Sequence, residues 1–466
     1  MTPLPVYTEP YRPQFHFSPP QWWMNDPNGL VYYEGEYHFF YQHNPGATVW
    51  GPMHWGHALS TDLVHWQHLP IAMYPDEIGT IFSGTAVVDA NNTSGLVPGG
   101  GLVAIYSYDN QSLGAAYSVD RGRTWHKYGG NPIIPAMAKD FRDPKIMWYA
   151  PLQRWVMALA VGQIVKFYTS PDLLHWDHAS DFTGGYIGGT WEMPDLFPLT
   201  VAGQVRWILI LGVSSTAPAG GSGTRYFIGG FDGKTFVDAY PDKTLWLDYG
   251  PDNYAGTTWN NLPANQRIFI GWMNNWLYAN EIPTSTWRGS TTVPRELSLL
   301  QTADGLRLAQ TPVAALKELR QPINTWNDLI IENSVVLNGL HGKQLEIIAE
   351  FELGTAEIFG FEFFAGAASV QITYNTRLSQ LTVNRPQADV KALPTTFSAP
   401  LPAHGSRIQL HLYVDHSTIE IFADGGLLSV STLAFPQPDD DAVNLFTKGG
   451  SVHLLSLEAY SLASIW

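Results

Sequence analysis

Asp26 lies in the segment WWMNDPNGL, residues 22–30, where the backbone sequence restrains a carboxylate. Pro27 fixes its own φ and disfavours the helical region for Asp26, and Asn28-Gly29 favours a tight bend. A carboxylate held by a stiff turn suits catalysis, which tolerates little misplacement of a reacting group. The same D-P-N-G sequence is equally explicable as an ordinary turn, so the role of Asp26 depends on partners elsewhere in the chain.

Two further acidic residues occur in comparable surroundings. Asp143 stands between Arg142 and Pro144 in FRDPK, residues 141–145, and Glu192 lies in WEMPDLF, residues 191–197, after a glycine-rich stretch. Each is expected just before a strand. Single Asp-Pro pairs carry little information, but three carboxylates with Arg or aromatic neighbours together indicate acid–base chemistry.

Strands account for nearly all of the predicted secondary structure. Runs of apolar and aromatic residues alternate with turn residues, and 43 Gly and 33 Pro leave little room for long helices. The one helical candidate runs from Pro312 to Glu318. The sequence therefore predicts an all-β protein.

An internal repeat indicates how these strands are grouped. STDLVHW at residues 60–66 is repeated as SPDLLHW at 170–176, with a longer copy at 118–125 and a worn copy at 231–236. The serines are 58 and 52 residues apart (118 − 60 and 170 − 118). A strand-rich period of this length is typical of β-propeller blades. On this hypothesis three successive blades bring Asp26, Asp143 and Glu192 together at the propeller axis.

The repeat ends near Arg295, and beyond Pro322 the strands become longer and more regularly alternating, as in a β-sandwich. We therefore divide the chain into a propeller at residues 1–310, a linker with a short helix at 311–325 and a sandwich at 326–466. The sandwich would also offer a surface for forming a homo-oligomer.

Composition excludes several classes of function. The formal net charge is −16 with only 25 Lys and Arg, which argues against nucleic acid and anionic membranes as partners. No apolar run is long enough to cross a bilayer. The absence of cysteine excludes thiol catalysis and thiolate metal sites. The first 20 residues lack the pattern of a signal peptide, so we expect a cytoplasmic protein or a secreted one with its leader removed.

Histidines at positions 54, 57, 65 and 68 raise the question of a metal site. His54 and His57 are three residues apart on a predicted strand and would point to opposite faces. We therefore expect neither a metal nor a cofactor.

The three acidic segments together resemble the signature motifs of the glycoside hydrolase family 32 β-fructosidases, which include invertases, levanases and exo-inulinases. The matching stretches are WMNDPNG (23–29), RDP (142–144) and WExPD (191–195), with further matches at 40–45, 50–57, 82–84 and 412–422. The resemblance covers nearly the whole chain. It implies a five-bladed β-propeller followed by a β-sandwich, and fructan or sucrose as the substrate.

The family mechanism, carried over to the matching residues, is a retaining double displacement with a covalent fructosyl-enzyme intermediate. Asp26 would be the nucleophile, Glu192 the acid/base, and Asp143 the residue that stabilises the oxocarbenium-like transition state. Such a pair requires opposite protonation states, so we expect a lowered pKa for Asp26 and a raised one for Glu192. Arg142 would keep a carboxylate ionised or orient Glu192.

The resemblance also implies a set of substrate-binding residues. Hydrogen bonds to fructose are expected from polar side chains, and pocket walls from aromatic ones, with Trp23 suited either to the site or to packing of the propeller. The set is Trp23, Asn25, Gln42, Trp50, Phe82, Ser83, Arg142, Asp252 and Trp276.

The chain departs from the family pattern beside the acid/base, where Met193 replaces the usual Cys. A thioether neither ionises nor donates a proton, so any tuning of Glu192 by this neighbour must differ. Two alternatives to a hydrolase are a fructosyltransferase that uses the same intermediate and a non-catalytic fructan-binding protein. The sequence leaves the choice among sucrose, inulin and levan open.

Overall fold

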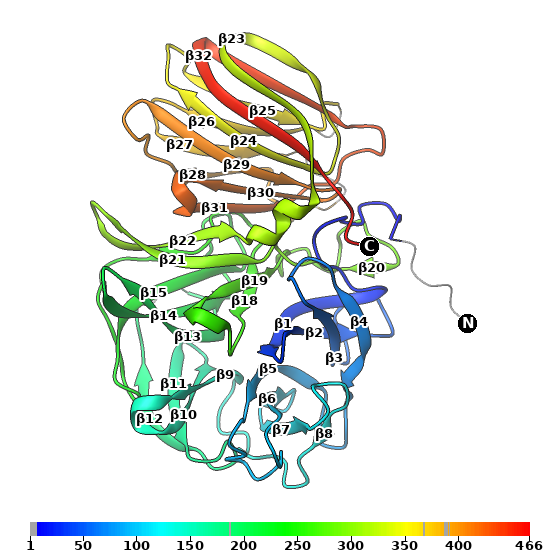
Figure 1. The fold of residues 1–466 in the computed structure, drawn as a ribbon, viewed down its shortest axis with the longest axis vertical. Helices are drawn as coiled ribbons and strands as arrows, with labels where there is room; N and C mark the ends of the chain where they lie inside the picture. The colour runs from blue at the N-terminus through cyan, green and yellow to red at the C-terminus, as the bar shows by residue number, and fades with distance from the viewer. Residues whose placement is uncertain (1–6, 186–187, 367–368, 386–389, 391) are drawn as a thin grey trace.

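The computed structural model describes residues 7–185, 188–366, 369–385, 390 and 392–466. Five sheets, antiparallel except for the pairing of β20 with β1, surround a common axis, and a larger β-structure packs against one side of this ring (Figure 1). The all-β prediction, with a five-bladed propeller followed by a β-sandwich, is confirmed. Among the described residues no helix is long and apolar enough to span a bilayer.

Each blade has an inner strand near the axis and its remaining strands stacked outward. The first blade consists of β1 (Trp22–Tyr33), β2 (Glu36–Asn44), β3 (His54–Ser60) and β4 (Gln67–Met73), with β20 (Trp287–Arg288) added beside β1. The second blade consists of β5 (Ile81–Val88), β6 (Leu102–Tyr108), β7 (Leu113–Ser118) and β8 (His126–Lys127). The third consists of β9 (Phe141–Tyr149), β10 (Arg154–Val161), β11 (Ile164–Ser170) and β12 (Asp177–Phe182), with the 3₁₀ turn η1 (Ala150–Leu152) between its first two strands.

The last two blades complete the ring. The fourth consists of β13 (Trp191–Val201), β14 (Gln204–Val213), β15 (Gly223–Phe231), β16 (Phe236–Asp238) and β17 (Leu245–Trp246). The fifth consists of β18 (Tyr254–Thr258), β19 (Ile268–Trp272), β21 (Arg295–Thr302) and β22 (Gly305–Pro312), with η2 (Pro263–Asn265). Successive inner strands contact one another around the axis, and β18 contacts β1. Closure is sealed by backbone hydrogen bonds from the Asn260 N–H to the Leu30 carbonyl (2.9 Å) and from the Tyr32 N–H to the Asn260 carbonyl (3.0 Å).

The sequence repeat corresponds to one turn that recurs at the end of the third strand of a blade. After β3, the Ser60 hydroxyl donates to Asp62 (3.0 Å), whose Oδ1 accepts the N–H groups of Val64 (2.9 Å) and His65 (2.8 Å). Asp172 after β11 makes the same contacts, and Asp120 after β7 a closely similar set. The side chains thus satisfy backbone donors that a sharp turn leaves free.

A single 3₁₀ helix, η3 (Ala314–Leu319), joins the propeller to the second domain. It overlaps the predicted helix, but Pro312 belongs to the end of β22 rather than to the helix. Strand β23 already begins at Arg320, within the range assigned to the linker.

The second domain is a nearly closed β-sandwich built from one antiparallel sheet. Its order is β28-β27-β26-β25-β32-β24-β29-β30-β31, and β23 pairs with β32. The long strand β32 pairs with β25 through residues 443–448 and with β24 through residues 453–461, which connects the two halves. The strands are β23 (Arg320–His341), β24 (Leu345–Glu352), β25 (Ile358–Phe363), β26 (Val370–Asn375), β27 (Gln380–Asn384), β28 (Thr396–Pro400), β29 (Arg407–Val414), β30 (Thr418–Ala423), β31 (Leu428–Leu433) and β32 (Ala442–Leu462), with η4 (Asp424–Gly426).

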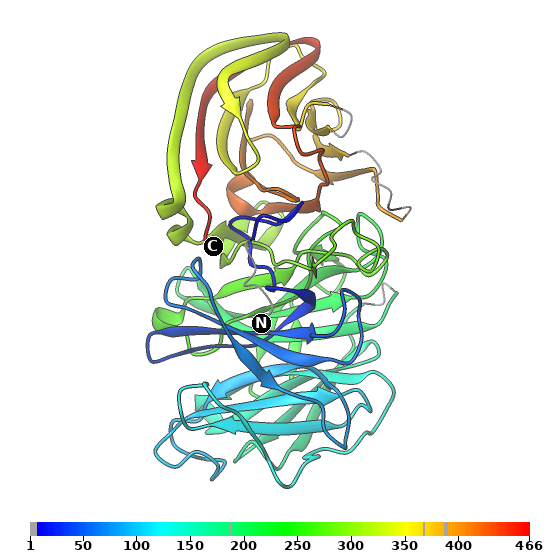
Figure 2. The same cartoon turned by 90° about the vertical axis from the view of Figure 1, so that its right-hand side faces the viewer.

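Buried charges hold the two domains together. Arg295 on β21 contacts Glu420 of the sandwich and lies 3.2 Å from Asp248 of the propeller. The N-terminal segment runs between the domains (Figure 2), where His16 contacts Asp415 and Glu420, each at 2.9 Å. Burial opposes a charge on His16, but the hydrogen bonds and charges of the two carboxylates outweigh it and raise the pKa of His16 to about 9.

His16 should make the stability of the protein depend on pH. Its folded pKa of about 9 exceeds the value of about 6.5 expected in the unfolded chain, so its stabilising contribution is complete below about pH 6.5 and is lost as the pH rises through about 9. We expect the parent to have a higher Tm than His16→Gln at pH 6. This difference in Tm should become smaller at pH 9.5. Thermal unfolding at both values measures this, and a constant difference would contradict it.

Candidate active site

The five inner strands share a local pattern at the end that opens to the site. Each carries two consecutive residues that precede Pro or Gly, and at this point the pairing with the second strand shifts by a β-bulge. The pairs are Asn25-Asp26, Phe82-Ser83, Arg142-Asp143, Glu192-Met193 and Tyr254-Ala255. A bulge bends a strand and redirects its side chains. The propeller therefore presents ten positions around one end of its axis.

The predicted stiff turn around Asp26 is instead part of β1, interrupted by two register shifts on either side of Pro27-Asn28. Asp143 and Glu192 likewise lie within β9 and β13 rather than before them. The carboxylates come from the first, third and fourth blades and not from three successive blades, because the second blade contributes Phe82 and Ser83.

These side chains surround a cavity of about 320 Å³. It is lined by ten of the twelve residues that the sequence predicts for the site. They are Asn25, Asp26, Gln42, Trp50, Phe82, Ser83, Arg142, Asp143, Glu192 and Trp276. The structure thus brings all three carboxylates to one cavity.

Both oxygens of Asp26 accept hydrogen bonds, one from the Asn25 amide (2.9 Å) and one from the Ser83 hydroxyl (2.7 Å). The sequence predicts a lowered pKa for Asp26, and this prediction is wrong. Burial raises the pKa of Asp26 to about 6, because it outweighs the two hydrogen bonds, and the charge of Glu192 adds to the effect.

Both carboxylate oxygens of Glu192 accept hydrogen bonds, one from a residue of the third blade and one from a residue of the fifth. Arg142 donates to Oε1 from Nη2 (2.7 Å) and from Nε (3.2 Å), and the Tyr254 hydroxyl donates to Oε2. The Asp140 carboxylate fixes the other side of the Arg142 guanidinium at 2.7 Å. Burial opposes the charge of Arg142, but the neighbouring carboxylates raise its pKa further above its ordinary range.

Asp143 has the most restricted backbone of the three, with a φ of 64°, and Met193 opposite has a φ of 50°. The Met193 N–H donates to Asp143 Oδ2 at 3.1 Å. Burial raises the pKa of Asp143, the charges of Glu192 and Asp26 raise it further, and Arg142 opposes them. Met193 thus serves Asp143 through its backbone, while its side chain packs with Trp23, Tyr254 and Trp272.

The uncharged residues that line the cavity add a hydrogen-bond donor and aromatic walls. Gln42 is buried, and its Nε2 has no hydrogen-bond partner within the described part of the chain, which leaves a donor for a bound molecule. The Trp50 ring is 46% exposed and meets the Phe82 ring edge-on at 6.1 Å. Such a mixture of unsatisfied polar groups and aromatic faces is typical of a binding pocket.

Two predicted residues do not line the cavity. Trp23 is fully buried behind it, stacks on Trp276 at 6.0 Å and donates from Nε1 to Asn25 at 2.7 Å. Asp252 is fully buried and binds Tyr278 (2.5 Å), Arg385 (3.0 Å) and the backbone N–H of Leu433 (2.8 Å). Its carboxylate is therefore committed to the contact between the domains.

A second polar layer lies three positions further along each inner strand. Its members are all buried and are Asn28, Thr85, Lys145, Asp195 and Thr257. Lys145 Nζ lies 3.6 Å from Asp195 and 3.0 Å from Thr257 Oγ1, and Asp195 accepts the Thr258 N–H at 2.6 Å. This pair connects the strands that carry Asp143 and Glu192.

Comparison with known proteins identifies the family. The sequence profile of the glycosyl hydrolases family 32 N-terminal domain matches residues 16–312, and that of the family 32 C-terminal domain matches residues 315–461. The chain belongs to glycoside hydrolase family 32. It is therefore a glycoside hydrolase, and the resemblance inferred from its motifs is confirmed.

Its relatives share most of its length. A levanase of Bacillus subtilis is 45% identical over 99% of this chain and 72% of its own length. An extracellular exo-inulinase of Aspergillus awamori is 36% identical, and the match covers 99% of this chain and 96% of the relative. A crystal structure of exo-inulinase from that organism superposes with a TM-score of 0.94 at 33% identity. This superposition covers 99% of this chain and 100% of the other chain. A β-fructofuranosidase from Schwanniomyces occidentalis, complexed with fructosyl-erythritol, gives a TM-score of 0.91 at 29% identity, with 98% and 99% coverage.

Tyr254, whose hydroxyl donates to Glu192, is a residue of the candidate site that the sequence analysis did not predict. Its segment, Tyr254-Ala255-Gly256, has neither an acidic residue nor a proline. One pattern in the sequence could have indicated Tyr254: each of the five inner strands carries two residues directly before a Pro or Gly, and Tyr254-Ala255 is the pair of the fifth strand.

The buried pair beneath the site predicts a specific stability effect. Lys145→Met removes the cation and leaves Asp195 charged and buried, so we expect the free energy of unfolding to fall by about 3–5 kcal/mol. The double variant Lys145→Met/Asp195→Asn removes both charges and should recover much of that loss. Chemical denaturation of the three proteins measures the effect, and a double variant no more stable than the single one would exclude it.

Proposed function

We propose that this protein is a retaining exo-β-fructosidase that hydrolyses terminal β-D-fructofuranosides in fructans, such as levan or inulin, and in sucrose. The observation that carries the proposal is the convergence of Asp26, Asp143 and Glu192 on one cavity in a chain of family 32. The names of the relatives, a levanase and an exo-inulinase, support polymers of fructose as substrates.

The shape of the cavity supports action at the end of a chain. We infer that the buried layer around Lys145 and Asp195, three residues further along the inner strands, forms a floor to the cavity along the propeller axis. A polymer cannot pass through a pocket with a closed floor, so only a terminal unit reaches Asp26. This geometry supports the release of single fructose units.

In the proposed reaction Asp26 attacks the anomeric carbon while Glu192 donates its proton to the departing glycosidic oxygen. The C–O bond to the leaving group breaks as the bond to Asp26 forms, which gives a covalent fructosyl-enzyme. Glu192 then takes a proton from water, the resulting hydroxide displaces Asp26, and fructose leaves with its original anomeric configuration. Asp143 binds fructose hydroxyls and stabilises positive charge on the ring.

The hydrogen bonds of the site support these roles. Asn25 and Ser83 position both oxygens of Asp26, so the nucleophile has one orientation. Arg142 and Tyr254 position Glu192. The free Nε2 of Gln42 supplies a donor for a fructose hydroxyl.

Asp26→Ala should abolish turnover, with kcat on sucrose reduced on the order of 10⁴-fold or more, because no other group can form the covalent intermediate. Product analysis on sucrose, inulin and levan tests the rest of the proposal. We expect fructose alone from the polymers. Oligosaccharides would indicate endo-action, and transfer products at high sucrose would favour a fructosyltransferase. An inactive parent that still binds fructan would favour a non-catalytic binding protein.

Ser83→Ala should shift the acidic limb of the pH–rate profile upward. Asp26 must be ionised to attack, so this limb follows its pKa of about 6. The Ser83 hydrogen bond stabilises the charged form, and its loss raises that pKa by about one pH unit. The measurement is kcat/KM on sucrose from pH 4 to 8. An unmoved acidic limb, with a uniform loss of rate instead, would show that Ser83 contacts only the substrate.

A further inference from the structure

A long loop forms part of the wall of the candidate active site. Residues 273–286 connect β19 to β20 and contain no strand, and Trp276 in this segment lines the cavity that contains Asp26. We call this segment the mouth loop. Because no ladder of strand hydrogen bonds satisfies its backbone, its shape depends on the side chains that bind it.

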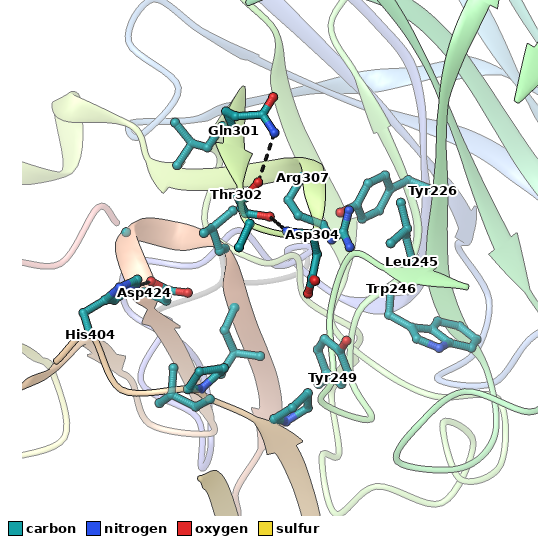
Figure 3. A pocket seen from close by; sticks show the side chains of 18 residues that line it. Tyr226, Leu245, Trp246, Tyr249, Gln301, Thr302, Asp304, Arg307, His404 and Asp424 are labelled. Carbon is teal, nitrogen blue, oxygen red and sulfur yellow. Dashed lines mark hydrogen bonds and ion pairs between the residues drawn. The ribbon is translucent and has the colours of Figure 1, made fainter. Parts of the chain in front are cut away.

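The sandwich supports one side of the mouth loop. Elsewhere a cavity of about 820 Å³ separates the two domains, and Tyr249 lies across this cavity from His404 and Asp424 (Figure 3). At the mouth loop the domains pack closely instead, and Arg385 donates to the Tyr278 hydroxyl at 3.3 Å. The buried apolar cluster at this contact consists of Met273, Tyr278, Ile282, Val390, Leu393 and Leu433. The sandwich thus anchors the loop by packing.

Arg288 on β20 binds the second half of the mouth loop. Its guanidinium donates to the backbone carbonyls of Asn280, Ile282 (2.9 Å) and Thr284 (2.9 Å). Its Nε also donates to the Thr284 hydroxyl at 3.4 Å. An apolar side chain at this position would leave three carbonyls of the loop without these donors. The backbone of residues 280–284 is therefore folded around one side chain.

The charge of Arg288 is not compensated by an ion pair with any carboxylate in the described ranges of the chain. The residue is 9% exposed, and burial lowers its pKa. In this it differs from Arg295 and Arg385, which bind carboxylates at the domain interface. Burial of an unpaired charge is unfavourable. Arg288 therefore contributes through its planar set of donors, whose geometry lysine does not reproduce.

Asn280 connects this arrangement to the opening of the cavity. Its carbonyl accepts a hydrogen bond from Arg288, while its side-chain Oδ1 accepts the Trp50 N–H at 3.1 Å. The Trp50 ring lines the cavity and is 46% exposed, so it lies at the opening. At the other end of these contacts, Arg288 is paired with Trp23 where β20 joins β1. The contacts thus run from the inner strand of the first blade to Trp50.

We propose that Arg288 is a positioning residue for substrate binding, which fixes Trp50 and Trp276 at the opening of the cavity by holding the mouth loop. The inference rests on the proposed fructosidase activity, which supplies the substrate. The contacts that hold Asp26 and Glu192 come from the inner strands and do not involve this loop. Loss of Arg288 should therefore weaken binding and leave the chemical step unchanged.

The first test is Arg288→Met. We expect KM for sucrose and inulin to rise on the order of tenfold, with kcat within about twofold of the parent and an unchanged pH profile of kcat. Arg288→Lys keeps the charge and three donors, so it should recover part of the loss. A kcat that falls as much as KM rises, or a shifted pH profile, would overturn the proposal, because the effect would then lie on the carboxylates.

Arg267 provides the matched control. It is half-buried, burial lowers its pKa, and its Nη1 donates to the Gln266 carbonyl at 3.1 Å. It precedes β19 at the end of the fifth blade opposite to the cavity, since Tyr254 pairs with Trp272 at the other end of that strand. Arg267→Met should leave KM unchanged. A rise in KM equal to that of Arg288→Met would overturn the proposal by showing a general effect of losing an arginine.

Asn280 keeps the test decisive if Arg288→Met does not fold. The residue is exposed, so Asn280→Ala removes the bond to Trp50 without altering the core, and KM should rise about fivefold. Asn280→Asp keeps an acceptor and should retain the parent KM. In a Trp50→Ala background, Asn280→Ala should have no further effect.

Two outcomes of the Asn280 series contradict the proposal. They are an unchanged KM in Asn280→Ala and an equal rise in KM when the same substitution is made in the Trp50→Ala background. Both are measured in a parent that hydrolyses sucrose. A parent that releases no fructose from sucrose would instead contradict the proposed function.

Discussion

The constraint on which this structure depends is the convergence of five inner strands on one axis. Side chains that point to the axis have neighbours from every blade and too little space for a layer of large apolar groups. The chain meets this constraint with two layers of polar side chains, and within each layer these side chains bind one another. In the lower layer Lys145 and Asp195 compensate each other's charge. In the upper layer the bulges turn Asp26, Asp143 and Glu192 toward the open end. The candidate active site thus lies where the five inner strands converge.

The upper layer places three carboxylates around one permanent cation. Arg142 binds Glu192 directly, so it partly compensates the negative charge, but burial still raises the pKa of Asp26 and Asp143. Burial and the mutual repulsion of the carboxylates thus hold the pKa values of Asp26 and Asp143 above their ordinary range. The double displacement proposed above requires an ionised nucleophile and a proton donor within the same small volume.

The sequence was sufficient for much of this site, and the failures have physical causes. The residues that line the cavity could be identified because their motifs match a family position by position. Asp252 was misplaced because the family resemblance gives the position of a residue in the chain but not the direction of its side chain, and this carboxylate turns to the sandwich. The predicted direction of the shift in the Asp26 pKa was wrong because a sequence does not reveal how much solvent a carboxylate loses on folding. The β1 backbone was taken for a turn because Pro and Gly mark bulges as well as turns.

The interface between the domains extends the same argument beyond the active site. Arg295, His16 and Asp252 are buried there with partners on both sides, so separation of the domains would leave uncompensated charges. These buried ion pairs thus hold the two domains together. The sandwich has a definite physical role in this scheme, since β31 orients the propeller segment that carries Tyr249.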